Sequence, residues 1–362
     1  MARSRLRLRP ADPDLAPCRR LGAADADRAR PSRRKACGEG RRQRRSGEAT
    51  PPARPAAQAR SGQGRDEGRE AVGGLYPPAP GEAHGKEDGE GSCDLTAHWK
   101  ARVAYDGTRY AGFQVQPNAP TVQAELERAL SILCDERVRV TGAGRTDAGV
   151  HASGQVIDFR TASALDGATI GRGVNALLPE DIAVSGLGPA AEEFHARFSA
   201  TGRTYEYRIR NALERDPLER LREHHVDTAL DVAAMRDAST ALVGRKDFSA
   251  FAAGPGGVRT IRSAEWCSEG SLVRFEITAD AFLRGMVRAI VGTLLWAGRA
   301  KIDSAAFAAI VDSRDRGKAG PSAPANGLCL VSVQYDQDLG ATNSGGSAPR
   351  PLNANEQNEA DE

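Results

Sequence analysis

The feature that most constrains the fold of this chain is the point at which apolar periodicity begins, near Trp99. Residues 1–96 are rich in Arg, Ala, Gly and Pro and show neither a helical nor a strand period. Such a segment cannot bury enough apolar surface to offset the conformational entropy that folding removes. The tail 337–362, rich in Gly, Asn, Ser, Pro and Glu, has the same character. We therefore expect disordered segments at 1–96 and 337–362 and a fold confined to 97–336.

Charge is distributed unevenly, and most of the basic excess lies in the N-terminal extension. Residues 1–64 carry 17 basic against 6 acidic side chains, whereas residues 96–362 carry a net charge of −4. The overall net charge of +2 therefore says nothing about nucleic-acid binding by the folded part. Three interpretations of the N-terminal extension are open. It could be a segment without function or the product of a mis-assigned start, a basic arm that adds nonspecific RNA affinity, or an Arg-rich organelle transit peptide. The acidic character from residue 65 argues against the transit peptide, and we take the first reading as the working interpretation.

The longest candidate for a membrane span, residues 281–298, is interrupted by Arg284 and Arg288. A spanning helix needs about 20 mostly apolar residues, so we expect none. The cysteines form no C-x-x-C pair and no His-flanked cluster at the spacing of a zinc site; they are Cys18, Cys37, Cys93, Cys134, Cys267 and Cys329. We therefore expect no metal, no membrane partner and a cytoplasmic location.

Periodicity and turn signals between 97 and 336 predict strands and helices in irregular alternation. The strands are expected at 100–105, 138–140, 155–159, 203–210, 260–267, 271–279 and 328–335. The helices are expected at 120–133, 170–178, 228–243, 282–296 and 303–311, the last capped by Asp303 or Ser304. Neighbouring strands look antiparallel, which favours an α+β fold, with helices on one face of each sheet, over a doubly wound parallel sheet. Two halves of similar size are expected, 97–196 and 197–336.

A glycine-rich segment, residues 142–151 with the sequence GAGRTDAGVH, is the strongest chemical signal in the chain. It is not a dinucleotide fingerprint, because G-x-G-x-x-G requires Gly where this sequence has Asp147, and it lacks the Gly-Lys-Ser/Thr of a Walker loop. Glycines on both sides let the backbone turn tightly and let a bulky ligand come close. The loop is therefore expected to present the carboxylate of Asp147, with Arg145 on the same side. An Asp that binds the backbone N–H groups of its own turn is the alternative.

This segment, extended to GAGRTDAGVHASGQV, resembles the signature of the TruA-type tRNA pseudouridine synthases. Four further segments match the same family in order: YDGTRYAGFQ at 105–114, FHARFSATGRTYEYRI at 194–209, FLRGMVRAIVGTL at 282–294 and GPSAPANGLCLVSVQY at 320–335. The resemblance covers about residues 98–336, essentially the whole part of the chain that is expected to fold.

The resemblance implies a fold, an activity and a site. Asp147 matches the family's catalytic aspartate, and Arg288 matches the arginine that pairs with it. Tyr205 matches the tyrosine that stacks on the target base, and Arg145 matches an arginine that enters the RNA as the target nucleotide flips. The family is cofactor-free and homodimeric and isomerises uridine to pseudouridine at tRNA positions 38–40, in the anticodon stem-loop. Its two halves are RRM-like (ferredoxin-like) α+β units, whose mainly antiparallel sheets meet at a central catalytic cleft.

The residue types agree with that chemistry. The reaction breaks the N1–C1′ bond, rotates the uracil and rejoins it through C5, so it needs neither a metal nor a redox cofactor. Extrusion of the base from a stacked helix costs a few kcal/mol, of which an aromatic platform recovers ~1–3 kcal/mol. Arg203, Arg197 and Lys100 are expected phosphate contacts. Asp147 could attack C1′, add to C6 of the base or abstract the 2′ proton, and the sequence leaves all three roles open.

Two other functions fit parts of this pattern. A noncatalytic RNA-binding module could keep the shape of two RRM-like halves without the chemistry, and a synthase could act on another RNA. A pure binder has no use for an acid that faces phosphates, so the joint presence of Asp147 and Arg288 favours the enzyme. We expect tRNA and a second copy of the chain as its partners.

Overall fold

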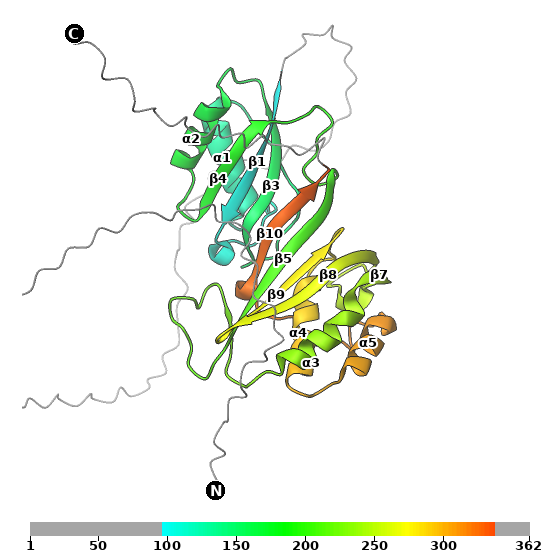
Figure 1. The fold of residues 1–362 in the computed structure, drawn as a ribbon. Helices are drawn as coiled ribbons and strands as arrows, with labels where there is room; N and C mark the ends of the chain where they lie inside the picture. The colour runs from blue at the N-terminus through cyan, green and yellow to red at the C-terminus, as the bar shows by residue number, and fades with distance from the viewer. Residues whose placement is uncertain (1–95, 337–362) are drawn as a thin grey trace, which may run out of the picture. The chain divides into compact units, whose positions relative to one another are not determined.

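The computed structural model describes residues 96–336 of the 362-residue chain (Figure 1). The predictions of disorder at 1–96 and 337–362 therefore fall, apart from Thr96, outside the described residues. Within 96–336, no helix is both long enough and apolar enough to cross a membrane.

The strands of residues 96–336 form one sheet of ten strands. Along its main path the order is β4-β1-β3-β10-β5-β9-β8-β7, with β2 paired to β3 and β6 paired to β5. The strands are β1 (Ala97–Tyr105), β2 (Val140–Gly142), β3 (His151–Thr161), β4 (Ile182–Pro189), β5 (Ala200–Asn211), β6 (His224–Val226), β7 (Gly244–Asp247), β8 (Val258–Glu269), β9 (Leu272–Ala279) and β10 (Leu328–Tyr335). Neighbours are antiparallel except for the parallel pairs β3–β10 and β5–β6. The prediction of helices combined with a mainly antiparallel sheet is confirmed.

Most helices of the described chain begin at a residue whose side chain caps them. The helices are α1 (Val122–Cys134), α2 (Gly167–Leu177), α3 (Val232–Ser239), α4 (Met286–Gly298) and α5 (Ser304–Ser313). The caps of α1, α2, α3 and α5 each accept a hydrogen bond from a first-turn N–H; they are Thr121, Asp166, Asp231 and Asp303. The predicted cap at Asp303 is confirmed. Helix α4 begins instead after Gly285, which has no side chain to cap it.

Several element boundaries differ from the sequence-based expectation, and each difference has a local cause. The helix expected at 228–243 begins only at Val232, because Asp231 caps it, and gives way after Ser239 to a 3-10 turn. Three strands were not expected. Strand β4 combines two glycines with a proline at the sheet edge, and β6 and β7 are short and mostly polar, so none has the composition typical of a strand.

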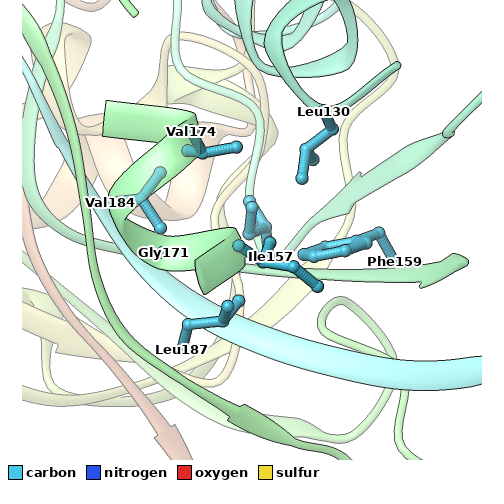
Figure 2. A pocket seen from close by; sticks show the side chains of 8 residues that line it. Leu130, Ile157, Phe159, Gly171, Val174, Val184 and Leu187 are labelled. Carbon is cyan, nitrogen blue, oxygen red and sulfur yellow. The ribbon is translucent and has the colours of Figure 1, made fainter. Parts of the chain in front are cut away.

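The buried side chains of the helices and the sheet form one connected hydrophobic core, with contributions from all five α-helices. In the N-terminal half, Leu130 of α1 and Val174 of α2 meet Ile157 and Phe159 of β3 and Val184 of β4 (Figure 2). Only apolar residues line the narrow space between these side chains. This space is therefore part of the core rather than a ligand site.

Two strands share one edge of β3, and the loop that carries Asp147 emerges between them. Strand β2 pairs with residues 157–159 of β3, whereas β10 pairs with His151 and Ala152 at the other end. Strand β10 also pairs with β5, so it joins the N-terminal part of the sheet to the C-terminal part (Figure 1). We call this junction of β3, β10 and β5 the seam. The loop 143–150 leaves the sheet at the seam.

Candidate active site

The loop between β2 and β3 is fixed by hydrogen bonds to the residues that precede Asp147. The carbonyl oxygen of Thr146 accepts from the N–H of Phe113 at 3.1 Å, and the Thr146 and Tyr105 hydroxyls are hydrogen-bonded at 2.8 Å. The side-chain amide of buried Gln155 accepts from the N–H of Gly144 at 3.3 Å and donates to its carbonyl oxygen at 2.6 Å. The loop therefore presents Asp147 from a backbone that its neighbours hold in place.

The carboxylate of Asp147 faces a guanidinium from the C-terminal half. Nη1 of Arg288, on α4, lies 3.5 Å from Oδ2 of Asp147, and 31% of the Asp147 side chain and 24% of the Arg288 side chain are exposed. Within residues 96–336, the carboxylate accepts no hydrogen bond from a backbone N–H. The alternative role of Asp147 as a turn residue that binds its own backbone therefore finds no support in the structure.

Gly285 precedes the first turn of α4 in a backbone conformation that favours glycine. Its φ of 67° lies in the left-handed region, where a side chain would strain the backbone. A Cβ at this position would also lie 4.0 Å from Oδ2 of Asp147 and 3.2 Å from the Cβ of Ala253. The apolar spacing predicted a helix from residue 282 onward and gave Gly285 no separate role. A glycine within an otherwise apolar helical pattern is the signal that could have marked it.

A segment before β10 holds Arg288 from the opposite side. The N–H of Ala323 donates to the carbonyl oxygen of Arg288 at 2.9 Å, and Nε of Arg288 donates back to the carbonyl oxygen of Ala323 at 2.8 Å. The contact is close because Gly292 has no side chain: a Cβ there would lie 1.7 Å from the carbonyl oxygen of Pro321. The Ala323 carbonyl oxygen and the Asp147 carboxylate therefore both orient the Arg288 guanidinium.

Two tyrosines on one face of β5 have different surroundings. Tyr205 packs edge-on against Phe282 with ring centroids 5.1 Å apart, and 7% of it is exposed. Burial, and to a smaller extent the charge of Asp147, raise the pKa of Tyr205 far above its usual value, so its hydroxyl stays neutral. Tyr207 is fully buried and donates to the carbonyl oxygen of Pro324 at 2.9 Å. Tyr205 is therefore near enough to Asp147 to be affected by its charge, whereas Tyr207 is bound to the segment that holds Arg288.

The basic residues expected at the RNA surface divide into two groups. Arg145 is exposed and makes no hydrogen bond or ion pair to another residue of 96–336, and Arg197 is exposed as well. Lys100, in contrast, is buried, with its ammonium 5.3 Å from the centre of the Phe194 ring. The structure thus leaves Arg145 and Arg197 accessible to a polyanion, and it does not leave Lys100 accessible.

Arg203 is not placed to contact a phosphate, which corrects the expectation drawn from the sequence. Its side chain is buried, and its two terminal nitrogens donate to four carbonyl oxygens, those of Ala143, Arg197, Ala200 and Asp280, at 2.7–3.0 Å. Ala143 opens the Asp147 loop, and Asp280 precedes the turn that leads into α4. The guanidinium therefore ties the backbones of the two segments that carry Asp147 and Arg288.

A hollow of about 370 Å³ lies at strands β1, β3, β5 and β10, but Asp147 does not line it. Its polar lining includes Asp106, His151, Glu206 and Arg208. His151 has a structural role there, because its Nδ1 accepts from the N–H of Gly107 at 3.1 Å and its Nε2 bonds the carbonyl oxygen of Leu221 at 2.8 Å. The mixed charges of this lining differ from the carboxylate–guanidinium pair at the seam.

The arrangement at the seam is a partly exposed carboxylate paired with a guanidinium, near a neutral tyrosine. Two segments of the chain, residues 101–199 and 238–336, match the family model described as tRNA pseudouridine synthase. The chain belongs to this family. Asp147 lies in the first matched segment and Arg288 in the second, whereas Arg203 and Tyr205 lie between the two.

Two relatives from this family align with the chain over nearly the whole of their own length. The chain is 47% identical over 247 residues to tRNA pseudouridine synthase A of Chloroflexus aurantiacus, covering 66% of this chain and 88% of that protein. It is 44% identical over 253 residues to the protein of the same name from Myxococcus xanthus, covering 68% and 96%. Among solved structures, a Cbf5-Nop10-Gar1 complex aligns with 66% of this chain and 50% of that chain, at 13% identity and a TM-score of 0.28, which is too low to establish a shared fold.

Proposed function

We propose that this chain isomerises uridine to pseudouridine at positions 38–40 of the tRNA anticodon stem-loop. The observation that carries the proposal is the pairing of Asp147 with Arg288, which brings a carboxylate and a guanidinium from the two matched segments to one place. The relatives that match nearly their whole length are named tRNA pseudouridine synthase A, which supports tRNA as the substrate.

Asp147 is proposed as the catalytic carboxylate. In the overall reaction the N1–C1′ bond breaks, a C5–C1′ bond forms, the C5 proton leaves and N1 gains a proton. Attack on C1′, addition to C6 and abstraction of the 2′ proton all require an ionised carboxylate beside the flipped nucleotide. Arg288 faces this carboxylate at 3.5 Å and fixes its orientation, because its own guanidinium is anchored on the Ala323 carbonyl oxygen. The chemistry itself requires no cofactor.

Tyr205 is proposed to stack on the target uracil, and Arg145 to enter the space that the flipped nucleotide leaves. The Tyr205 ring is held by Phe282 and sits close enough to Asp147 for that charge to affect its pKa. Arg145, two residues before Asp147, is exposed and has no partner within 96–336 to release first. These positions support a base that lies between the tyrosine and the carboxylate, with the arginine on the RNA side.

Substitutions of Tyr205 should separate stacking from the hydroxyl group. Tyr205→Phe should retain kcat within about threefold, because the hydroxyl is neutral and makes no hydrogen bond to a described residue. Tyr205→Leu should lower kcat/KM by about 5- to 150-fold, the equivalent of ~1–3 kcal/mol of stacking. Steady-state rates on a tRNA substrate measure both. Equal rates for wild type and Tyr205→Leu would show that the ring only fills space.

We also propose that each half of the chain, 97–196 and 197–336, is an RRM-like (ferredoxin-like) unit and that catalysis takes place at the seam between them. The N-terminal half runs β1-α1-β2-β3-α2-β4, and its strands lie in the order β4-β1-β3-β2. The corresponding elements of the C-terminal half are β5-α3-β8-β9-α4-β10, with the strands in the order β10-β5-β9-β8. Numbered along each half, both orders are 4-1-3-2, which supports two related units.

A homodimer is proposed as the working form. Residues 96–362 carry a net charge of −4, so the net charge of one copy does not attract a polyanion, whereas two copies can line one groove with arginines from both. The loop between β5 and β6 also exposes Leu213 by 70% and Leu218 by 90%, apolar surface that a subunit contact would cover. Sedimentation should give the mass of two chains, and Leu218→Glu should shift the protein toward the monomer. A monomer with full activity would contradict this proposal.

The experiment that tests the function is a map of pseudouridines in tRNA from a strain that lacks this gene. Pseudouridine should disappear from positions 38–40 and return when the wild-type gene is supplied, and the protein should act in the cytoplasm. An unchanged tRNA map with pseudouridine lost from another RNA would favour the synthase with a different substrate. No change in any RNA would favour the noncatalytic RNA-binding module.

A further inference from the structure

An aromatic ring stands out from the turn that connects the two halves. Phe198 is 75% exposed, whereas its neighbours Phe194 and Ala196 are buried. Single exposed apolar residues are common on protein surfaces and need no explanation by themselves. This ring differs because it is flanked by two groups that suit nucleic acid: the Arg197 guanidinium lies 5.4 Å from its centre, and the His195 ring lies 4.3 Å away between centroids.

Hydrogen bonds fix the backbone of the turn that carries Phe198. Nδ1 of His195 accepts from the N–H groups of Arg197 and Phe198 at 3.1 and 3.3 Å. The N–H of Ala196 donates to Oδ1 of Asp158 at 2.7 Å, and the N–H of Ser199 donates to the carbonyl oxygen of His195 at 2.9 Å. The backbone beneath the ring is therefore fixed before any ligand arrives, which lowers the entropy that binding must remove.

The same turn is attached to the catalytic loop. One terminal nitrogen of Arg203 donates both to the carbonyl oxygen of Arg197, at 2.7 Å, and to that of Ala143, at 3.0 Å. Ala143 precedes Asp147 by four residues, which span at most ~14 Å of extended chain. The backbone of the turn that carries Phe198 therefore lies beside the start of the loop that presents the carboxylate, and the exposed guanidinium groups of Arg145 and Arg197 belong to these two segments.

We propose that Phe198 is a stacking platform for an unpaired RNA base near the target uridine, with Arg197 as the contact to that nucleotide's phosphate. The inference rests on the proposed function, because it takes its ligand from the RNA that Asp147 would act on. Aromatic faces bind bases of any sequence, and a cation beside the ring adds a salt-dependent contribution. His195 presents its remaining Nε2–H to the same nucleotide, since its Nδ1 is used as an acceptor.

Substitutions of Phe198 in the full-length protein test the platform. With a tRNA anticodon stem-loop as the probe, Phe198→Leu and Phe198→Ala should raise both KM and Kd by about 5- to 150-fold, while kcat at saturation stays within about threefold. Phe198→Tyr and Phe198→Trp should bind like wild type. Ile132→Ala, which removes another exposed apolar side chain, this one on α1, is the matched control and should leave Kd unchanged.

The salt dependence of Kd distinguishes the contribution of the Phe198 ring from that of the Arg197 guanidinium. Arg197→Gln should reduce the slope of log Kd against log salt by about 0.7, whereas Phe198→Leu should leave the slope as it is. A wild-type Kd for Phe198→Leu, or a Phe198→Ala protein that turns from dimer to monomer in sedimentation, would overturn the platform. If wild type binds the stem-loop but forms no pseudouridine, the proposed function fails, and the Kd values still decide the role of Phe198.

Discussion

Replacement of Asp147 by asparagine should abolish pseudouridine formation, with kcat at least about 1,000-fold below wild type, because none of the three chemical roles of the carboxylate can be filled by an amide. RNA binding should persist, since the binding surface extends over both halves. The fold should also persist: the pair with Arg288 is partly exposed, and such pairs contribute about 0–1 kcal/mol. Single-turnover kinetics and a filter-binding Kd on the same preparation measure both properties.

Asp312→Asn provides the matched control for that substitution. Asp312 is exposed on α5, so the change from carboxylate to amide should alter neither kcat nor the melting temperature. An Asp147→Asn enzyme with appreciable turnover would show that another group carries the chemistry. Loss of RNA binding together with activity would instead indicate that Asp147 supports the structure of the loop.

Removal of the Arg288 guanidinium should have the second largest effect. Arg288→Ala should lower kcat by about 100-fold or more, the usual consequence of deleting one oriented group that stabilises charge at a reacting centre. Arg288→Lys should recover only part of the loss, because a single ammonium cannot bond the Ala323 carbonyl oxygen through one nitrogen and face Asp147 with another. Single-turnover rates across pH measure the effect on the chemical step.

Arg299→Ala serves as the control for the helix itself. Arg299 is exposed directly after the last turn of α4, so its removal tests whether loss of any arginine near this helix reduces activity. The control should be close to wild type. If Arg288→Lys matched wild type, a general positive charge would suffice, and the specific orientation described at the seam would be irrelevant to the reaction.

The local parts of the fold could be predicted from the sequence because their signals are local. Asp303 caps a helix that the apolar spacing also indicates, and the strand at 328–335 was predicted with the bounds that the structure shows. The seam could not be predicted in this way. It depends on β10 pairing with β3 and β5, strands distant in the sequence, and nothing in the composition of β10 specifies those partners.

For the site too, the sequence indicates the residue types, whereas the surroundings of each residue depend on the tertiary structure. The resemblance to a known family named Asp147, Arg288, Tyr205 and Arg145, and the structure brings the first three together. Arg203 was misinterpreted because an arginine in a sequence gives no sign of whether its acceptors are phosphates or buried carbonyl oxygens.

Release of the C5 hydrogen reports pseudouridine formation by this protein directly. Pseudouridine formation must expel that hydrogen, so purified protein incubated with tRNA that carries tritium on C5 of its uridines should release tritium into water. Tritium release should be matched by new pseudouridine at positions 38–40, and the Asp147→Asn protein should release none. Tritium release that continues in the Asp147→Asn protein, or a wild-type protein that releases none from any tRNA, would contradict this expectation.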